Sequence, residues 1–111
     1  ATASYIQAQQ LDVLVHCAGW KGRFNLEDSL YAGALVKSLE LTHQADEDGA
    51  LAMKSLFEKE GHQLKGYLSK ASHAKRLQNH GIESDIDFCL TLDLYQEVVK
   101  VNERGFLVLV E

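Results

Sequence analysis

The chain has 111 residues, of which 46% are hydrophobic and 24% are charged, a composition typical of a single globular domain. Its formal net charge of −5 argues against nucleic-acid or anionic-membrane binding, because no basic stripe offsets the acidic residues. No apolar run approaches the roughly 20 residues of a membrane span, and the two cysteines are expected to be reduced, buried thiols in a cytoplasmic protein.

The first part of the chain predicts a helix, a buried strand and a glycine-containing loop. The helix is expected over residues 3–9. Apolar and β-branched residues alternate over 11–17 enough to indicate a buried strand. The loop over 18–24 contains Gly19 and Gly22, which permit backbone conformations that are barred to other residues.

A long helix is predicted to follow this loop. Asn25 is a favourable N-cap, and Glu27 and Asp28 then fall in the first turn, where negative side chains are favoured. The helix is expected to run to about Thr42. Gly33 in its middle costs roughly 1 kcal/mol relative to alanine, which we interpret as a sign that another backbone approaches closely.

The rest of the chain predicts further helices and then a β-hairpin. The helices are expected over residues 46–60, 62–70, 73–80 and 85–92. Two apolar segments, 97–101 and 106–110, are typical of strands, and residues 102–105 join them as a turn. Because two or three strands make a poor sheet on their own, we expect the strands to be pieces of a larger mixed sheet.

Three motifs occur in order along the chain. They are Cys17-Ala18-Gly19-x-x-Gly22-Arg23-Phe24-x-Leu26-Glu27-Asp28, then Ser72-His73-x-x-Arg76-Leu77, then Gly81-Ile82-Glu83-Ser84-Asp85-Ile86-Asp87-Phe88-Cys89. Together with Ala32-Gly33-Ala34, which follows the first motif, they resemble the 2-phosphosulfolactate phosphatase family of coenzyme M biosynthesis. The likeness spans most of the chain, but the chain resembles only the C-terminal half of such a protein.

The resemblance implies a magnesium-dependent phosphatase with a three-layer α/β/α fold and a mixed sheet. Residues 1–111 would form a partial α/β domain with one buried strand, about five helices and a C-terminal hairpin. The substrate would be a small phosphorylated sulfo- or hydroxy-acid, such as 2-phosphosulfolactate, hydrolysed to the alcohol and phosphate. A preceding N-terminal half would complete the protein, in keeping with a chain that opens on Ala1 without an initiating methionine.

The motifs also indicate candidate site residues. Hydrolysis of a phosphate monoester needs positive charge on the phosphoryl oxygens and a proton for the leaving oxygen. Arg23 and His73 are the predicted catalytic residues, the first as an anion clamp and the second as a proton donor. The predicted substrate-binding residues are Gly22, Arg23, Asn25, Ser72 and Arg76. The predicted magnesium ligands are Glu27, Asp28 and Asp87.

Simpler structural explanations exist for the same residues. Arg23 suits a surface salt bridge, His73 suits an exposed helix position, and Asp87 suits a helix cap. Glu27 and Asp28 are adjacent on a helix and point about 100° apart, so both cannot serve one site equally. The alternative function is a non-catalytic anion-binding or oligomerisation module, which would pair with another copy of itself or with a separately made N-terminal half.

Overall fold

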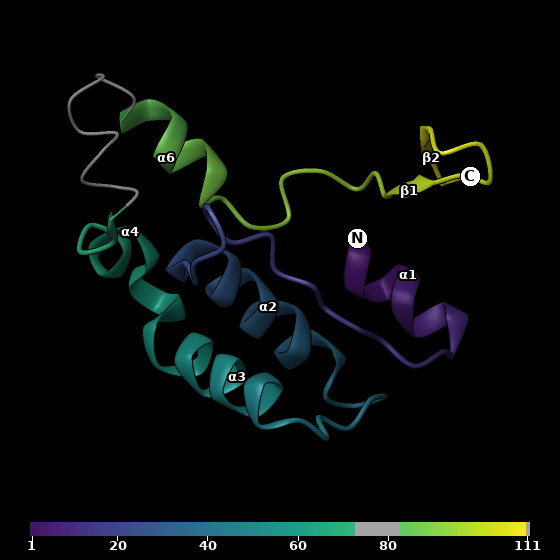
Figure 1. Cartoon of the computed structure of the whole chain (residues 1–111), viewed down its shortest axis with the longest axis horizontal. Helices are drawn as coiled ribbons and strands as arrows, with labels where there is room; N and C mark the ends of the chain where they lie inside the picture. Colours follow the sequence, from purple (N-terminus) through teal and green to yellow (C-terminus); the bar gives the residue numbers. More distant parts are fainter. Residues whose placement is uncertain (73–82, 111) are drawn as a thin grey trace.

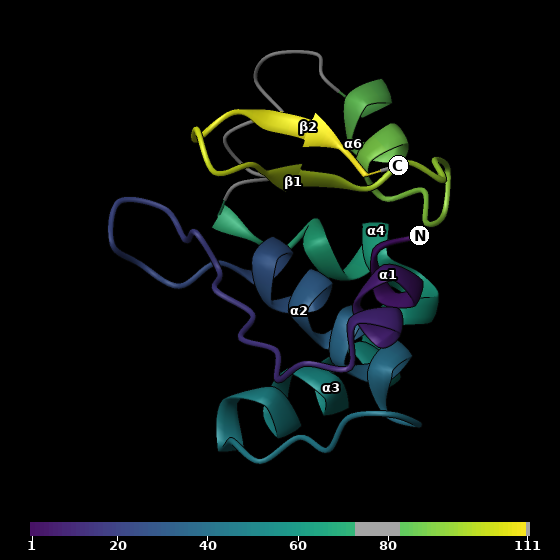
Figure 2. The ribbon, with the colours of Figure 1, turned by 90° about the vertical axis from the view of Figure 1, so that its right-hand side faces the viewer.

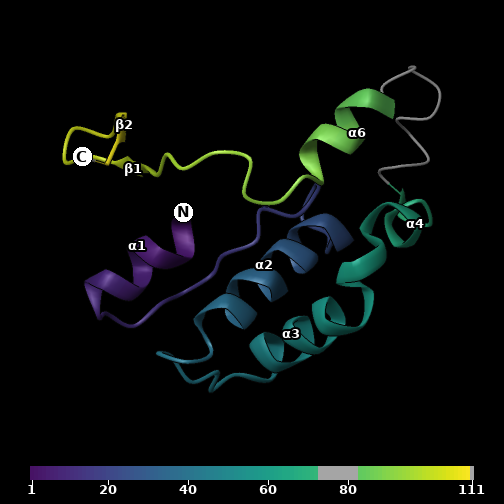
Figure 3. The same cartoon turned by 180° about the vertical axis from the view of Figure 1, so that it is seen from behind.

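The computed structural model describes residues 1–72 and 83–110, which form several helices and one small sheet (Figure 1). In chain order the elements are α1 (Thr2–Gln9), α2 (Leu26–Leu39), α3 (Asp48–Glu60), the short 3-10 helix η1 (Gly61–Gln63), α4 (Leu64–Leu68), α6 (Glu83–Cys89), β1 (Val99–Val101) and β2 (Leu107–Leu109). Helices α2 and α3 lie side by side, with α4 and α6 near one end of the pair and α1 near the other (Figures 1 and 3). The hairpin and α3 lie on opposite sides of the molecule (Figures 1 and 2).

The contact between α2 and α3 depends on a glycine in the middle of α2. A Cβ atom at Gly33 would overlap the carbonyl oxygen of Met53 and would lie 2.9 Å from Cβ of Phe57. The two backbones approach so closely at this point that no side chain fits between them. The prediction that another backbone approaches Gly33 is therefore confirmed.

A small apolar core lies where α2 meets α4 and the residues after it. Leu30, Leu68 and Ala71 are its buried members. Partly buried hydrophobic residues pack against them: Leu26, Leu56, Phe57, Leu64, Tyr67 and Leu90. This core fixes the first half of α2, which is the helix that begins directly after the glycine-containing loop.

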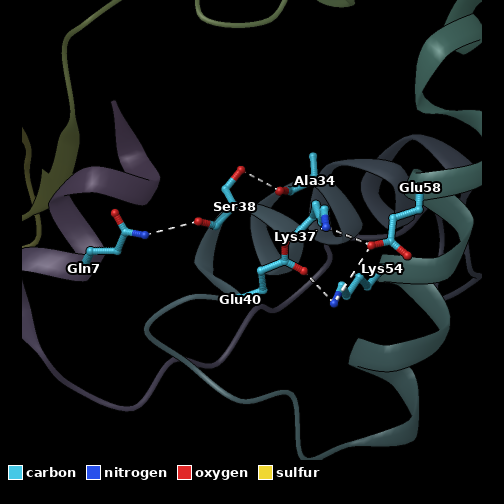
Figure 4. Close-up of polar contacts among 7 residues, drawn as sticks. All are labelled: Gln7, Ala34, Lys37, Ser38, Glu40, Lys54 and Glu58. Carbon is cyan, nitrogen blue, oxygen red and sulfur yellow. Dashed lines mark hydrogen bonds and ion pairs between the residues drawn. The ribbon is translucent and has the colours of Figure 1, made fainter.

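Four charged side chains join the C-terminal half of α2 to α3 (Figure 4). Lys37 Nζ lies 2.5 Å from Glu40 Oε1 and 3.1 Å from Glu58 Oε1. Lys54 Nζ lies 2.7 Å from Glu40 Oε2 and 3.9 Å from Glu58 Oε1. The hydrogen bonds that Glu40 accepts from Lys37 and Lys54 hold the pKa of Glu40 below its ordinary value of 4.5. The hydrogen bonds that Lys37 donates to Glu40 and Glu58 raise the pKa of Lys37.

This network predicts a pH-dependent contribution of Glu40 to stability. A carboxyl group whose pKa is lowered by folding stabilises the folded state above its unfolded pKa and stops doing so as the pH falls through the folded pKa. Glu40→Gln should therefore lower the melting temperature slightly at pH 7 in low salt, and this difference should disappear well below pH 4.5. Glu103→Gln is the control, since Glu103 joins no ion pair among the described residues. Thermal unfolding at both pH values checks the prediction, and a difference that persists in acid would contradict it.

The predicted three-layer α/β/α fold with a mixed sheet is wrong. Across residues 1–72 and 83–110 the only sheet is the antiparallel β1–β2 pair. The predicted buried strand at 11–17 has no regular secondary structure, and Leu11 and Leu14 are exposed. The physical reason is that an extended segment becomes a strand only when a neighbour accepts and donates its backbone hydrogen bonds. No second strand lies beside it in the part of the chain that the structure describes.

The local predictions fare better. The predicted helices at 3–9 and 46–60 correspond to α1 and α3, and the predicted hairpin corresponds to β1 and β2. Helix α2 ends at Leu39, before the expected Thr42, because residues 40–42 form a turn. The predicted helix at 73–80 lies outside the described residues.

The cysteines differ from expectation in their burial. Cys17 and Cys89 are free thiols, as predicted, but both are exposed.

None of the described helices is long and apolar enough to cross a lipid bilayer.

Candidate functional site

The glycine-containing loop folds into a tight turn that presents Arg23. The backbone N–H of Trp20 donates to the carbonyl oxygen of Arg23 at 2.9 Å, and the N–H of Arg23 donates to the carbonyl oxygen of Trp20 at 3.0 Å. Lys21 and Gly22 between them have φ angles of 50° and 71°. Positive φ at both central residues is the pattern of a type I′ turn, in which glycine is strongly preferred at the second position.

A hydrogen bond from a backbone N–H to a side chain of α2 ties this turn to the helix. The N–H of Gly19 donates to Asp28 Oδ2 at 2.6 Å. Gly19 has a φ of +66°, and a Cβ atom there would lie 2.6 Å from the carbonyl oxygen of Arg23. Glycine is therefore needed for both its backbone conformation and its small size. Because Asp28 lies in the first turn of α2, the bond fixes the loop against the N-terminus of that helix.

The N-terminus of α2 is capped as predicted. Asn25 has extended backbone angles, and its Oδ1 accepts a hydrogen bond from the N–H of Asp28 at 2.8 Å. The Ser29 hydroxyl donates to the carbonyl oxygen of Asn25 at 2.7 Å. The N-cap of the helix thus lies two residues after Arg23, which places the positive end of the helix dipole close to that residue in the chain.

Three of the predicted substrate-binding residues line one groove. Gly22, Arg23 and Asn25 contribute to a groove of about 970 Å³, bounded by segment 12–25 together with α2 and residues near the start of α3. The Arg23 side chain is exposed, and no carboxylate in residues 1–72 or 83–110 forms a salt bridge with it. A guanidinium in this setting is available to an external anion, such as a phosphate or a sulfonate.

Glu27 faces a different cavity. It lines a mostly apolar cavity of about 290 Å³ beside α4 and α6, together with Leu30, Phe57, Leu68 and Asp85. Glu27 Oε2 is buried and has no hydrogen-bond partner among the described residues. An unpaired buried carboxylate oxygen is costly, so a hydrogen-bond donor or a cation there would stabilise the site.

Asp85 is a residue that the sequence interpretation missed. It lines the same cavity as Glu27, whereas the predicted ligand Asp87 forms an ion pair with Lys65 Nζ at 2.6 Å. The two aspartates are two positions apart on α6, which separates their directions by about 200°. This spacing was the available signal that only one of them could face α2.

The three predicted metal ligands make different contacts in the described structure. Asp28 bonds to the Gly19 N–H, Glu27 lines the smaller cavity, and Asp87 pairs with Lys65. No group of three or more histidine, cysteine, aspartate or glutamate side chains with metal-binding geometry occurs in residues 1–72 and 83–110.

The remaining predicted site residues lie at or beyond the end of the first described segment, residues 1–72. Ser72 is exposed at the end of the first described range. His73 and Arg76 lie outside the described residues, so the predicted proton donor and second anion-binding arginine stay predictions.

Comparison with known proteins points to one family. Residues 1–104 match the family model described as 2-phosphosulpholactate phosphatase. A protein from Thermotoga maritima named "Probable 2-phosphosulfolactate phosphatase" is 43% identical over 107 residues, which are 96% of this chain and 46% of that protein. Proteins with the same name from Gloeobacter violaceus and Caldanaerobacter subterraneus are 38% and 34% identical over 96% and 92% of this chain. The chain spans about half the length of these relatives.

Proposed function

Because this chain belongs to the 2-phosphosulfolactate phosphatase family, we propose that it supplies part of the active site of a phosphatase. The proposed substrate is 2-phosphosulfolactate or another small phosphorylated sulfo- or hydroxy-acid, hydrolysed to the alcohol and inorganic phosphate. The observation that carries the proposal is the presentation of Arg23 beside the capped N-terminus of α2, within the segment that matches the family. The remaining half of a family member, or a second copy of the chain, would complete the site.

Arg23 is proposed to bind the anionic end of the substrate. A guanidinium can donate two parallel hydrogen bonds to phosphate or sulfonate oxygens, and it can neutralise charge that develops during phosphoryl transfer. The type I′ turn and the Gly19–Asp28 bond support this role, since both limit the motion of the backbone that carries Arg23. His73 as proton donor, and Ser72 and Arg76 as further substrate ligands, complete the proposal.

Magnesium is proposed as the cofactor, with Glu27 as its ligand from this chain. The unpaired buried oxygen of Glu27 fits a cation, and Asp85 lines the same cavity. Magnesium usually takes one or two carboxylates from the protein and completes its shell with water and substrate oxygens. When bound there, the ion would compensate the buried negative charge of Glu27, which lines a different cavity from Arg23. Asp28 and Asp87 have partners of their own within the described residues.

We also propose that the protein acts in the cytoplasm. The two free thiols support this proposal, because reducing compartments preserve such cysteines.

Release of inorganic phosphate tests the proposed function. The chain should be compared with a joined protein, in which the part of the Thermotoga maritima relative that it does not match is fused to it in the relative's order. The joined protein should release phosphate from 2-phosphosulfolactate in the presence of Mg²⁺, and EDTA should stop the reaction. Failure of the folded joined protein to release phosphate would overturn the proposal, and release that resists EDTA would overturn its magnesium part alone.

A further inference from the structure

The β1–β2 hairpin has an apolar face with no cover in the described structure. Val99 pairs with Leu109 and Val101 pairs with Leu107, so these four side chains lie on the same side of the hairpin. Their exposed fractions lie between 55% and 74%. We call these four residues the hairpin face.

The hairpin face is unusual for a surface that meets water. Directly paired strand residues are normally polar where a sheet faces solvent, yet all four members of this face are apolar. The opposite side carries the Lys100–Val108 pair, and Val108 is already half-buried. A two-stranded hairpin is marginally stable alone and gains stability when one face is covered. A contiguous exposed apolar surface of this kind marks an interaction site.

The comparison of lengths favours one occupant for this face. The chain accounts for 46% of the Thermotoga maritima relative and 44% of the Gloeobacter violaceus relative, although it is matched over 96% of its own length. A family member therefore contains at least as many residues again outside the matched part. We propose that an apolar surface of that unmatched half packs directly on the hairpin face and thereby holds the two halves of the active site together.

This inference rests on the proposed function for its claim about the active site, but its packing claim is measured without substrate. Val101→Thr/Leu107→Thr changes one directly paired couple on the hairpin face. Threonine is β-branched, like the valine that it replaces at position 101, and it favours a strand at both positions. It also removes apolar surface from the hairpin face. Leu41→Thr is the matched control, because Leu41 is 92% exposed and belongs to the α2–α3 connection, on the side of the molecule away from the hairpin (Figures 1 and 2).

Thermal unfolding should distinguish the two proteins. In the joined protein the double substitution should lower the melting temperature by about 5 °C or more, because the replaced side chains are buried there. In the chain alone the same substitution should change it by less than about 2 °C, because those side chains are exposed. Leu41→Thr should change neither protein. Equal effects of the double substitution in the two proteins would overturn the inference.

Amide hydrogen exchange provides a second measurement that does not depend on the substitutions. The amides of β1 and β2 should exchange at least about tenfold more slowly in the joined protein than in the chain alone, because a covered hairpin opens less often. Unchanged exchange in a folded joined protein would overturn the inference. The inference would also be overturned if the chain alone formed a dimer that the double substitution dissociates, because a second copy of the chain would then cover the hairpin face.

The outcomes separate this inference from the proposed function. A joined protein that releases phosphate while its hairpin amides exchange as fast as in the chain alone contradicts only the inference. A joined protein with a protected hairpin and no phosphate release contradicts only the function.

Discussion

Replacing Arg23 with alanine is expected to lower phosphate release by the joined protein about 10²- to 10³-fold, the range found when one preorganised donor to a developing anion is removed. The guanidinium is exposed in the groove, two residues before the cap of α2, and no carboxylate in the described structure neutralises it. Arg23→Lys should recover only part of the activity, because an ammonium cannot make the paired, planar contact of a guanidinium. Steady-state assays of phosphate release measure both effects.

Arg104 provides the control for this prediction. It is also exposed, but it lies in the β1–β2 turn and outside both cavities. Arg104→Ala should leave turnover within about twofold of the unsubstituted protein, as expected for a surface change away from the site. If Arg23→Ala behaves like Arg104→Ala in a folded protein, Arg23 has no part in the reaction.

Replacing Gly33 with alanine is expected to reduce the free energy of unfolding by about 2 kcal/mol or more. Alanine normally favours a helix over glycine by roughly 1 kcal/mol, but overpacking a tight contact costs about 1–3 kcal/mol and occasionally more. Here the added methyl group would overlap the Met53 carbonyl oxygen, and it would also press on Cβ of Phe57. Backbone atoms cannot move aside as a flexible side chain can, so α2 and α3 must separate.

Gly49→Ala is the matched control for this experiment. Gly49 lies in α3, and a Cβ atom built there meets no atom within 4 Å beyond its chain neighbours and the backbone of its own helix. Alanine at that position should be neutral or should stabilise the chain by up to about 1 kcal/mol. Denaturant unfolding of both variants gives the comparison. Similar stabilities for Gly33→Ala and Gly49→Ala would show that α2 and α3 are not in close contact.

The sequence predicts the elements whose structure depends on nearby residues. The hairpin turn is an example, because Asn102 Oδ1 accepts hydrogen bonds from the N–H groups of Arg104 and Phe106 within the same turn. The cap of α2 is another, since Asn25 and Asp28 are three residues apart. The strand at 11–17 was predicted wrongly because a strand requires a partner from elsewhere, and its own residue pattern cannot provide one.

The same distinction applies to the candidate site. Gly22, Arg23 and Asn25 are close in sequence, and the structure places them along one groove. The direction of Glu27 depends on how α2 packs against α4 and α6, as does the choice between Asp85 and Asp87. Motif spacing does not contain that information. The set of metal ligands therefore stays a prediction: Glu27 lines the smaller cavity, whereas Asp28 and Asp87 have partners of their own.

Each of the two cavities contains one of the two cysteines. Cys17 lines the groove with Arg23, and Cys89 lines the smaller cavity with Glu27. Both thiols are exposed, and no other cysteine competes with them for a labelling reagent. A fluorophore attached to Cys17 in a Cys89→Ser background would report on anion entry into the groove, and the converse pair would report on the cavity beside Glu27. The chain thus has a natural attachment point for an optical reporter in each compartment.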